Sequence, residues 1–247
     1  MLKDKTVIVT GGAKGIGKAI ALAFANEGCN IVLNYRSTSP EEVKAEIEAK
    51  GVKCFTVQAD VSKFDEALKL VEAAKEEFGT IDVLVNNAGI SQKVTVADMT
   101  LDDIKRIFNV NMFGLFLITQ AVCEVMKKQN YGRIVHLSSV SGKRGGGIFG
   151  GAHYSASKAA VLGFSKNLAR EVSSYGITTN CVCPGLINTE IWKSLPKEQA
   201  DAVIDGIPMG RPGEPQEVAD AIVFLASKEA SYITGEEIDI NGGSHMD

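Results

Sequence analysis

The stretch TVIVTGGAKGIG at residues 6–17 decides the fold of this chain. Its first four residues form a short, apolar, β-branched run, which predicts a buried strand. The glycines that follow permit a tight turn and a close approach of the backbone to a phosphate. A helical pattern begins directly after the turn and stops at Gly28, so the helix N-terminus would point at that phosphate. Strand, glycine-rich turn and helix in this order indicate a dinucleotide-binding unit.

Six more short apolar runs follow, and helical patterns separate them. Because the runs are continuously apolar, they predict parallel strands that are buried on both faces. No linker or break in composition divides the chain. We therefore predict a single α/β domain over residues 1–247, a doubly wound (Rossmann) fold with a parallel seven-stranded sheet and helices on both faces. The predicted strands are residues 6–9, 30–34, 54–58, 81–85, 133–137, 178–182 and 236–240.

Two segments between these strands stand out. Thr100 is a good N-cap and predicts a long helix that runs to about Lys128. Residues 189–205 fit the repeating pattern poorly and have a proline near each edge. We predict that they form a small helical flap beside the substrate.

Composition narrows the class of protein. The chain has 247 residues, 45% of them hydrophobic, and a net charge of −4 that is scattered along the sequence, which argues against nucleic-acid and membrane partners. It starts without a signal-like segment, and no apolar run approaches the length of a membrane span. Five cysteines form no CxxC pair and three histidines lie far apart, so no metal site is expected. We expect a cytoplasmic protein with reduced thiols.

The end of the second predicted strand bears on the choice of nucleotide. It reads NYR at residues 34–36, without the acidic residue that usually binds the ribose hydroxyls of NAD. Arg36 offers a guanidinium to a 2′-phosphate, and Lys14 in the glycine turn could reach the same group. The alternative is that both cations are merely solvated. This pattern favours NADP(H) over NAD(H).

Further small and polar residues follow the third and fourth predicted strands, at the sheet edge where ligands bind in such folds. Together with the glycine turn they trace one nucleotide crevice. The predicted contacts up to this point are Gly11, Lys14, Gly15, Ile16, Gly17, Arg36, Asp60, Val61, Asn87, Ala88 and Gly89.

A tyrosine and a lysine point to the chemistry. Tyr154 and Lys158 stand four residues apart in a predicted helix, which puts both side chains on one face. A nearby positive charge favours a phenolate and lowers the pKa of the tyrosine. A tyrosine so tuned can pass a proton to or from a substrate oxygen. Taken alone, such a pair is more often a half-buried ring beside a solvated amine.

Six motifs occur in order and carry a family resemblance. They are TGGAKGIG at 10–17, NNAG at 86–89, Asn111, LSSVSG at 137–142, YSASK at 154–158 and PGLINT at 184–189. The chain resembles the short-chain dehydrogenase/reductase family over its whole length. It is most similar to the 3-oxoacyl-ACP reductase-like members, for which the ending ASYITGEEIDINGG at 230–243 is typical.

The resemblance implies roles for particular residues. Tyr154 would be the general acid in reduction and the base in oxidation, and Lys158 would lower its pKa and bind the nicotinamide ribose. Ser139 would hydrogen-bond the substrate oxygen, with Ser141 as the second candidate. Asn111 would shape a helix near Lys158 and hold a water for a proton relay.

The resemblance also implies further cofactor contacts and an assembly. The nicotinamide end would lie against Tyr154, Lys158, Pro184, Gly185, Ile187 and Thr189. A homotetramer is implied, with the long helices that start at Leu101 and Ala152 at one interface and the C-terminal strand at another.

The implied activity is NAD(P)-dependent interconversion of a ketone and a secondary alcohol. The leading substrate is a 3-oxoacyl thioester on an acyl carrier protein, which Lys127, Lys128 and Arg170 could receive unless they are ordinary solvated charges. Two segments depart from that branch: the glycine-rich stretch after Gly142 and SQKVTV at 91–96.

These departures keep other readings open. A sugar, polyol or sugar acid is the second class of substrate, with Gln92, Lys93 and His153 making a polar pocket, and a steroid is the third. A non-catalytic nucleotide-binding regulator is the alternative of a different class. The complete set of Asn111, Ser139, Tyr154 and Lys158 argues against such a regulator.

Overall fold

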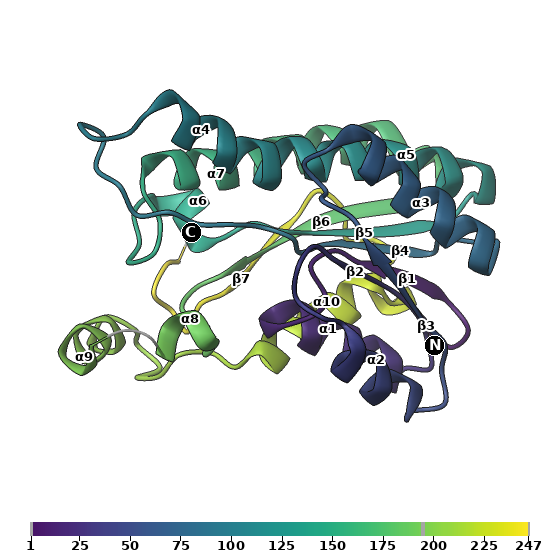
Figure 1. Ribbon diagram of the computed structural model, residues 1–247, viewed down its shortest axis with the longest axis horizontal. Coiled ribbons are helices and arrows are strands. Elements are labelled where there is room, and N and C mark those ends of the chain that lie inside the picture. Colours follow the sequence, from purple (N-terminus) through teal and green to yellow (C-terminus); the bar gives the residue numbers. More distant parts are fainter. Residues whose placement is uncertain (1, 194–195, 247) are drawn as a thin grey trace.

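The computed structural model describes residues 2–193 and 196–246, where strands and helices alternate (Figure 1). The strands are β1 (Thr6–Val9), β2 (Asn30–Tyr35), β3 (Cys54–Gln58), β4 (Val83–Asn86), β5 (Gly132–Leu137), β6 (Ile177–Pro184) and β7 (Glu237–Ile240). The helices are α1 (Gly15–Asn26), α2 (Glu41–Glu48), α3 (Phe64–Phe78), α4 (Leu101–Phe108), α5 (Leu115–Gln129), α6 (Val140–Arg144), α7 (Ala152–Val172), α8 (Glu190–Lys193), α9 (Lys197–Asp205) and α10 (Pro215–Ala226), with short turns η1 (Asn109–Gly114), η2 (Ser173–Tyr175) and η3 (Lys228–Ala230).

The seven strands of the described chain form one parallel sheet in the order β3-β2-β1-β4-β5-β6-β7. This confirms the predicted fold, and the predicted strand ends differ from the observed ones by no more than two residues. The connections reverse direction at β1, where Val7 pairs with Ile31 of β2 on one side and with Val83 of β4 on the other. A crevice opens at the carboxyl ends of strands at such a switch point.

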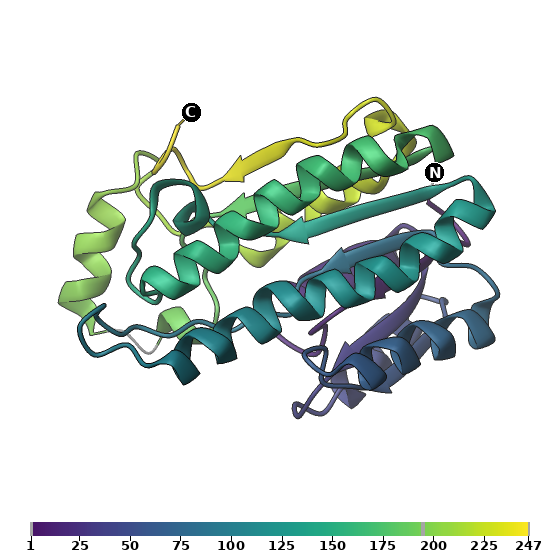
Figure 2. The same ribbon diagram turned by 90° about the horizontal axis from the view of Figure 1, so that it is seen from above.

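Helices cover both faces of the sheet, and this explains the continuously apolar strands. In β1, Val7 and Val9 are fully buried in the core beneath α1, α2 and α10. Ile8 is fully buried in the opposite core, beneath α3, α5 and α7. Figure 1 shows the sheet edge-on between the two helix layers, and Figure 2 shows α5 and α7 lying side by side over it.

The predicted long helix is interrupted in the middle. Thr100 and Asp103 form a capping box at its start, where each side chain accepts from the other residue's backbone N–H. The chain then runs through α4 and the π-helical η1 into α5, and it ends at Gln129. By length and mean hydropathy (1.4) alone, Leu101–Gln129 would pass for a membrane span. Core helices pass the same test, and this one packs on α3 and α7 with 44% of the window buried.

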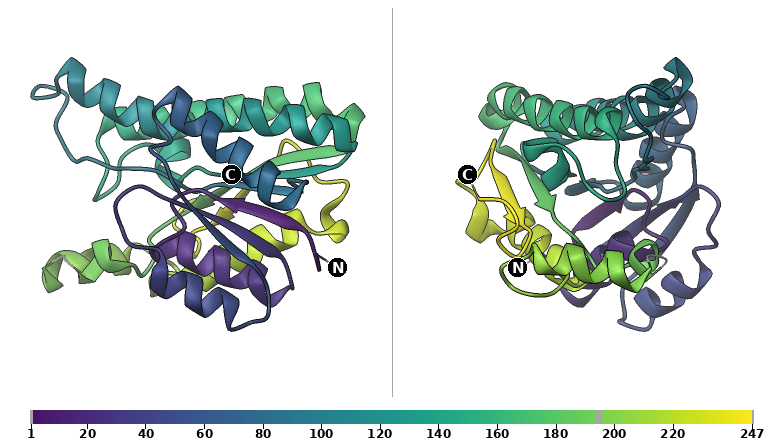
Figure 3. Two further views of the ribbon diagram at one scale, coloured as in Figure 1. Left: turned by 45° about the vertical axis from the view of Figure 1, so that its right-hand side comes forward. Right: turned by 90° about the vertical axis from the view of Figure 1, so that its left-hand side faces the viewer.

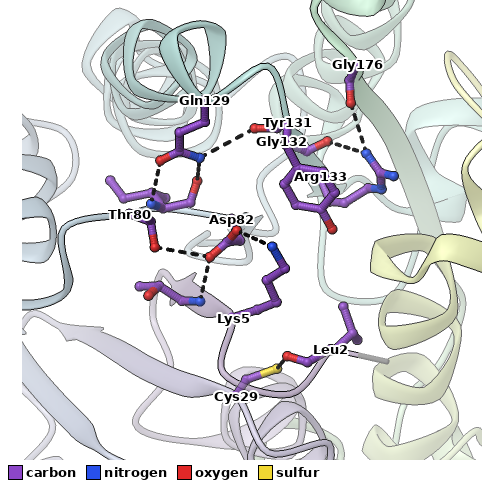
Figure 4. Close-up of polar contacts among 12 residues, drawn as sticks. Leu2, Lys5, Cys29, Thr80, Asp82, Gln129, Tyr131, Gly132, Arg133 and Gly176 are labelled. Atoms are coloured by element: carbon purple, nitrogen blue, oxygen red, sulfur yellow. Dashed lines mark hydrogen bonds and ion pairs between the residues drawn. The ribbon is translucent and has the colours of Figure 1, made fainter.

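The amino edge of the sheet is closed by a polar cluster (Figure 4). Asp82, at the start of β4, accepts hydrogen bonds from Lys5 Nζ (2.8 Å) and from the backbone N–H of Thr6 (2.9 Å). Lys5 Nζ also lies 4.3 Å from the ring centroid of Tyr131, and the Arg133 guanidinium lies 4.6 Å from it. These contacts join the starts of β1, β4 and β5. The amino edge of the sheet is therefore occupied by polar contacts within the protein.

Helices α8 and α9 project beyond the sheet at its carboxyl edge (Figure 3). They occupy the segment for which we predicted a flap, and residues 194–195 between them lie outside the described residues. Helix α9 has no buried residue. It therefore contributes little to the core, as a movable segment requires.

Candidate active site

Two adjoining cavities lie at the carboxyl edge of the sheet. The first, of about 410 Å³, lies at the crossover between β1 and β4 and is here called the switch-point cavity. The second, of about 560 Å³, contains the tyrosine and is called the Tyr154 cavity. They form one crevice because they share lining residues, namely Lys14, Ile16, Asn87, Gly89, Ile90 and Thr189.

The glycine turn has no room for side chains. Gly11 has φ +63°, a region that L-residues rarely adopt. A Cβ on Gly17 would lie 2.3 Å from Gly11 O and 2.5 Å from Asn87 Nδ2. Helix α1 starts directly after Lys14, which makes no side-chain cap. Its first N–H groups therefore point toward the cavity without a side-chain acceptor, which is the arrangement that binds phosphate.

Thr10 holds the two sides of the switch-point cavity together, and sequence reasoning did not single it out. Its hydroxyl accepts hydrogen bonds from the backbone N–H groups of Asn87 and Ala88, both at 3.0 Å. In return, Asn87 Nδ2 donates to the carbonyls of Thr10 (2.8 Å) and Gly11 (3.1 Å). The predicted contact Asn87 is thus also a strut between the ends of β1 and β4.

Asn34 plays a similar part at the end of β2. Its side chain is buried, accepts from Gly11 N (3.2 Å) and donates to Ala59 O (3.0 Å). The amide of Asn34 is therefore occupied, whereas Arg36 is exposed and lines the switch-point cavity.

Asp60 lines the same cavity from the end of β3. Burial raises its pKa, but the hydroxyl of Ser62 at 2.7 Å, the Ser62 N–H at 3.0 Å and the charge of Arg36 outweigh burial. The net pKa is below the ordinary value, so Asp60 is a carboxylate at neutral pH.

Tyr154 and Lys158 lie one turn apart on α7 and both line the Tyr154 cavity, as predicted. The effect of the lysine differs from the prediction. Lys158 Nζ donates to the carbonyl of Leu137 at 2.7 Å, and burial lowers the pKa of Lys158 to about 8. Burial also raises the pKa of Tyr154, which a hydrogen bond with Ser139 only partly offsets. The predicted lowering of the Tyr154 pKa by Lys158 is wrong for this structure, because desolvation dominates.

The serine cluster after β5 is fixed by close packing. A Cβ on Gly142 would lie 2.8 Å from the carbonyl carbon of Lys158, so α6 rests directly on the α7 backbone. Ser138 Oγ donates to Lys158 O (2.9 Å), which gives it a structural role. Ser139 and Ser141 both line the Tyr154 cavity, and of the two it is Ser139 that lowers the pKa of Tyr154.

Asn111 lies behind the crevice and lines neither cavity. It is on the π-helical η1, whose widened turn is a common feature of functional sites. Its Oδ1 accepts from Ile90 N (2.8 Å), and its Nδ2 donates to Ile90 O (2.9 Å) and Ser157 Oγ (3.1 Å). A Cβ on Gly89 would lie 3.4 Å from Asn111 Oδ1 and 3.5 Å from Lys158 Nζ. Asn111 thereby ties the segment after β4 to α7.

The remaining wall comes from the chain after β6. A Cβ on Gly185 would lie 2.8 Å from Asn241 Cβ, so the turn after Pro184 packs tightly on the end of β7. Ile187 pairs with Gly213 in an isolated bridge. Thr189 lines both cavities from the far side of the glycine turn. With the exception of Asn111, every predicted site residue therefore borders one crevice.

The predicted polar pocket of Gln92, Lys93 and His153 is wrong, because none of the three lines either cavity. Instead they hold the glycine-rich loop in place. Lys93 Nζ donates to Gly147 O (2.8 Å), and His153 Nε2 lies 3.1 Å from Gln92 Oε1. A Cβ on Gly150 would lie 2.4 Å from Tyr154 Cδ1, so this loop packs directly on the tyrosine ring.

Within the described ranges, no three His, Cys, Asp or Glu side chains are grouped closely enough to hold a metal ion. All five cysteines are unpaired and buried.

Comparison with known proteins finds similarity over nearly the whole chain. The family described as Enoyl-(Acyl carrier protein) reductase matches residues 11–245. A 3-oxoacyl-[acyl-carrier-protein] reductase of Synechocystis is 43% identical over 248 residues, covering 99% of this chain and 98% of the relative. The enzymes of the same name from Staphylococcus epidermidis and Staphylococcus aureus are each 40% identical, covering 98% and 100% of this chain and the full length of each relative.

Proposed function

The chain belongs to the short-chain dehydrogenase/reductase family of NAD(P)-dependent oxidoreductases, and on that premise we propose that it reduces the ketone of 3-oxoacyl thioesters with NADPH. One observation carries the proposal. The hydroxyl of Ser139 lies close enough to Tyr154 to lower its pKa, and both side chains line a cavity that continues into the switch-point cavity. A carbonyl oxygen between them would receive two hydrogen bonds next to a bound nucleotide.

The matched names describe two different reactions, namely reduction of an enoyl double bond and reduction of a 3-oxo group. We favour the 3-oxo group for two reasons. The relatives that are 40–43% identical carry that name. In addition, two hydroxyl donors that meet at one point suit a carbonyl oxygen, on which negative charge develops during reduction.

The residues of the crevice fit a nicotinamide dinucleotide. The cradle of Gly11 and Gly17 would be filled by any side chain, and it lies at the start of α1, where a pyrophosphate would find unpaired N–H groups. Bound there, the cofactor supplies the hydride. Arg36 supports NADPH, because it is exposed at the end of β2 while the neighbouring Asn34 is occupied internally.

The chain's own residues would handle the proton. Because burial raises the pKa of Tyr154, the phenol is protonated at neutral pH and can donate its proton to the carbonyl oxygen. Ser139 would hold that oxygen, and Lys158 would supply a positive charge on the buried side of the cavity. This protonation state suits reduction rather than oxidation.

The first experiment follows NADPH absorbance with an acetoacetyl thioester, in parallel with NADH and with a crotonyl thioester as the enoyl control. We expect turnover of the acetoacetyl compound with NADPH. Turnover only with NADH would refute the role of Arg36, and turnover only of the crotonyl compound would refute ketone reduction. No turnover of either thioester would favour the sugar, polyol and sugar-acid class.

A tyrosine variant separates an enzyme from a nucleotide-binding regulator. Tyr154→Phe should lose nearly all turnover, by a factor of about 10²–10⁴, while nucleotide binding by fluorescence titration stays within about two-fold. Retained activity would contradict the assignment of the proton donor. Binding without turnover in the wild type would support the regulator.

Assembly and partners complete the proposal. Leu101 (63% exposed), Phe113 (54%) and Phe116 (42%) form an apolar strip along α4, η1 and α5, which supports a homotetramer with these helices at an interface. Light scattering that returned a monomer would refute it.

Lys128 and Arg170 are exposed on α5 and α7 and would receive an acidic carrier protein in the cytoplasm. Helices α8 and α9 would close over the substrate as the flap.

A further inference from the structure

The charges that border the Tyr154 cavity all have one sign. Its charged lining residues are Lys14, Arg144 and Lys158, and among the described residues no carboxylate lines it. Lys14 also lines the switch-point cavity, and Lys158 is buried against Leu137. Arg144 belongs to the Tyr154 cavity alone.

Arg144 is held at the rim of this cavity by its position in the chain. It is the last residue of α6, five residues after Ser139, which corresponds to about 7.5 Å along a helix axis. Its side chain is exposed, and Nη1 donates to Ser244 O at 2.8 Å. No carboxylate partner of Arg144 is found in residues 2–193 and 196–246. Most of its donors therefore remain available to a ligand.

The three glycines after Arg144 turn the chain back beside the serine cluster. Gly145, Gly146 and Gly147 have φ values of +76°, +71° and +126°, so the chain turns back sharply over α6. A Cβ on Gly147 would lie 2.9 Å from Ser141 Oγ, and Lys93 anchors the carbonyl of the same glycine. Gly147 therefore packs beside the serine cluster, whereas a Cβ on Gly145 or Gly146 would meet nothing within 4 Å.

Apolar atoms make up the larger part of the lining of the Tyr154 cavity. The apolar side chains include Val140, Ile148, Phe149, Leu186 and Val203. An apolar chamber with a cation at its rim suits a carbon chain that ends in an anionic group.

We propose that Arg144 is a specificity-determining residue that binds a carboxylate or phosphate of the ketone substrate. This rests on the proposed function and narrows its substrate class to anionic ketones. The planar fork of arginine binds such groups through two parallel hydrogen bonds. The anion could be a carboxylate at the far end of the acyl chain or the phosphate of a pantetheine arm.

Matched substrate pairs distinguish these sources. One pair is the N-acetylcysteamine thioesters of 3-oxohexanoate and 3-oxoadipate, which differ by a terminal carboxylate. The other is acetoacetyl-pantetheine with and without its 4′-phosphate. Each is tested with wild type, Arg144→Gln, Arg144→Lys, and Lys69→Gln as a control that removes an exposed charge on α3.

We expect Arg144→Gln to lower kcat/KM for the anionic member of one pair by about 10- to 100-fold and for its neutral member by less than two-fold. Arg144→Lys should recover part of the loss, and Lys69→Gln should change neither. The pair that responds identifies the source of the anion. Equal effects on the anionic and neutral members of both pairs would overturn the proposal.

A binding measurement separates this proposal from the proposed function. Glutarate, an unreactive dicarboxylate, is titrated by calorimetry into the NADPH-bound wild type and Arg144→Gln proteins. If no thioester is reduced but glutarate binds the wild type at least ten-fold more tightly, the anion site stands and the thioester assignment fails. If thioesters are reduced without charge discrimination and glutarate binding does not depend on Arg144, the anion site fails alone.

Discussion

Replacing Asn111 by alanine should lower the unfolding free energy of the protein as well as its catalytic activity. The side chain is 1% exposed and makes three hydrogen bonds, two with the backbone of Ile90 and one with Ser157. Alanine would leave these partners without Asn111, at about 1–3 kcal/mol for each buried group. Because Ile90 is only half-buried, its groups regain some water, and we expect a total loss of roughly 2–4 kcal/mol.

For a domain of this size, 1 kcal/mol corresponds to a change in Tm of about 2–4 °C. Asn111→Ala should therefore lower Tm by roughly 5–15 °C in calorimetry. Ser157→Ala removes the one bond that Asn111 makes to α7, together with the bond from Ser157 Oγ to Tyr154 O (2.7 Å), and should lower Tm by about 2–4 °C. Asn111→Asp keeps the acceptor for Ile90 N but loses the two donors, so its Tm should lie between those of the wild type and the alanine variant.

The same substitution should affect nucleotide binding. Gly89, which precedes Ile90, lines both cavities and packs against Asn111 Oδ1. Freed from Asn111, this segment should move, and the KM for NADPH should rise together with the loss in kcat. If Asn111→Ala melts within 2 °C of the wild type, the hydrogen bonds of Asn111 are not what holds the segment of Gly89 and Ile90. A purely catalytic role for Asn111 would then be favoured.

Three further predictions concern the tyrosine loop and two buried bases. Gly150→Ala should lower kcat with little change in nucleotide affinity, because the new Cβ would displace the Tyr154 ring. Equal losses in kcat and in nucleotide affinity would contradict this explanation. His136 has a pKa of about 3, lowered by burial and then by the charge of Lys158, so the unfolded state binds more protons below about pH 6.5. The wild type should therefore lose unfolding free energy relative to His136→Gln, by up to about 1.4 kcal/mol per pH unit, as the pH falls from 6 to 4.5 in urea titrations. Burial lowers the pKa of Lys158 to about 8, so the unfolded state binds more protons than the folded state between about pH 8 and 10.5. As the pH rises through that window, the wild type should gain unfolding free energy relative to Lys158→Met. A difference between the two proteins that does not change with pH would refute the burial of a charged amine.

The sheet was predictable because its signals are local. Each parallel strand buried on both faces leaves a short continuous apolar run, and each helix leaves a periodic pattern with a cap or a glycine at its end. Gly79, for example, has φ +76° and ends α3. The widened turn at Asn109–Gly114 was not predictable, because its residues are compatible with an ordinary helix and the tertiary bonds of Asn111 decide its shape.

The site was only partly predictable. The order of motifs located the crevice, but hydrogen-bond partners distant in sequence determine what each polar side chain does. Asn34 bonds Gly11 and Ala59, and Lys158 bonds the carbonyl of Leu137 rather than modifying the tyrosine. Arg144 left one sequence signal that could have found it, an arginine directly before three glycines in the loop between the serine and the tyrosine.

The position of β1 between β2 and β4 also determines the order in which this protein can fold during synthesis. Val7 pairs with Ile31 early, but its other partner, Val83, leaves the ribosome about 50 residues later, which corresponds to roughly 3–10 s of translation. During that interval β1 presents one unpaired edge, and the glycine turn lacks the Asn87 strut that will hold it. Non-local parallel pairing of this kind is slow to form. The nascent chain is therefore most exposed to aggregation before β4 emerges, and chaperone binding would be most useful there.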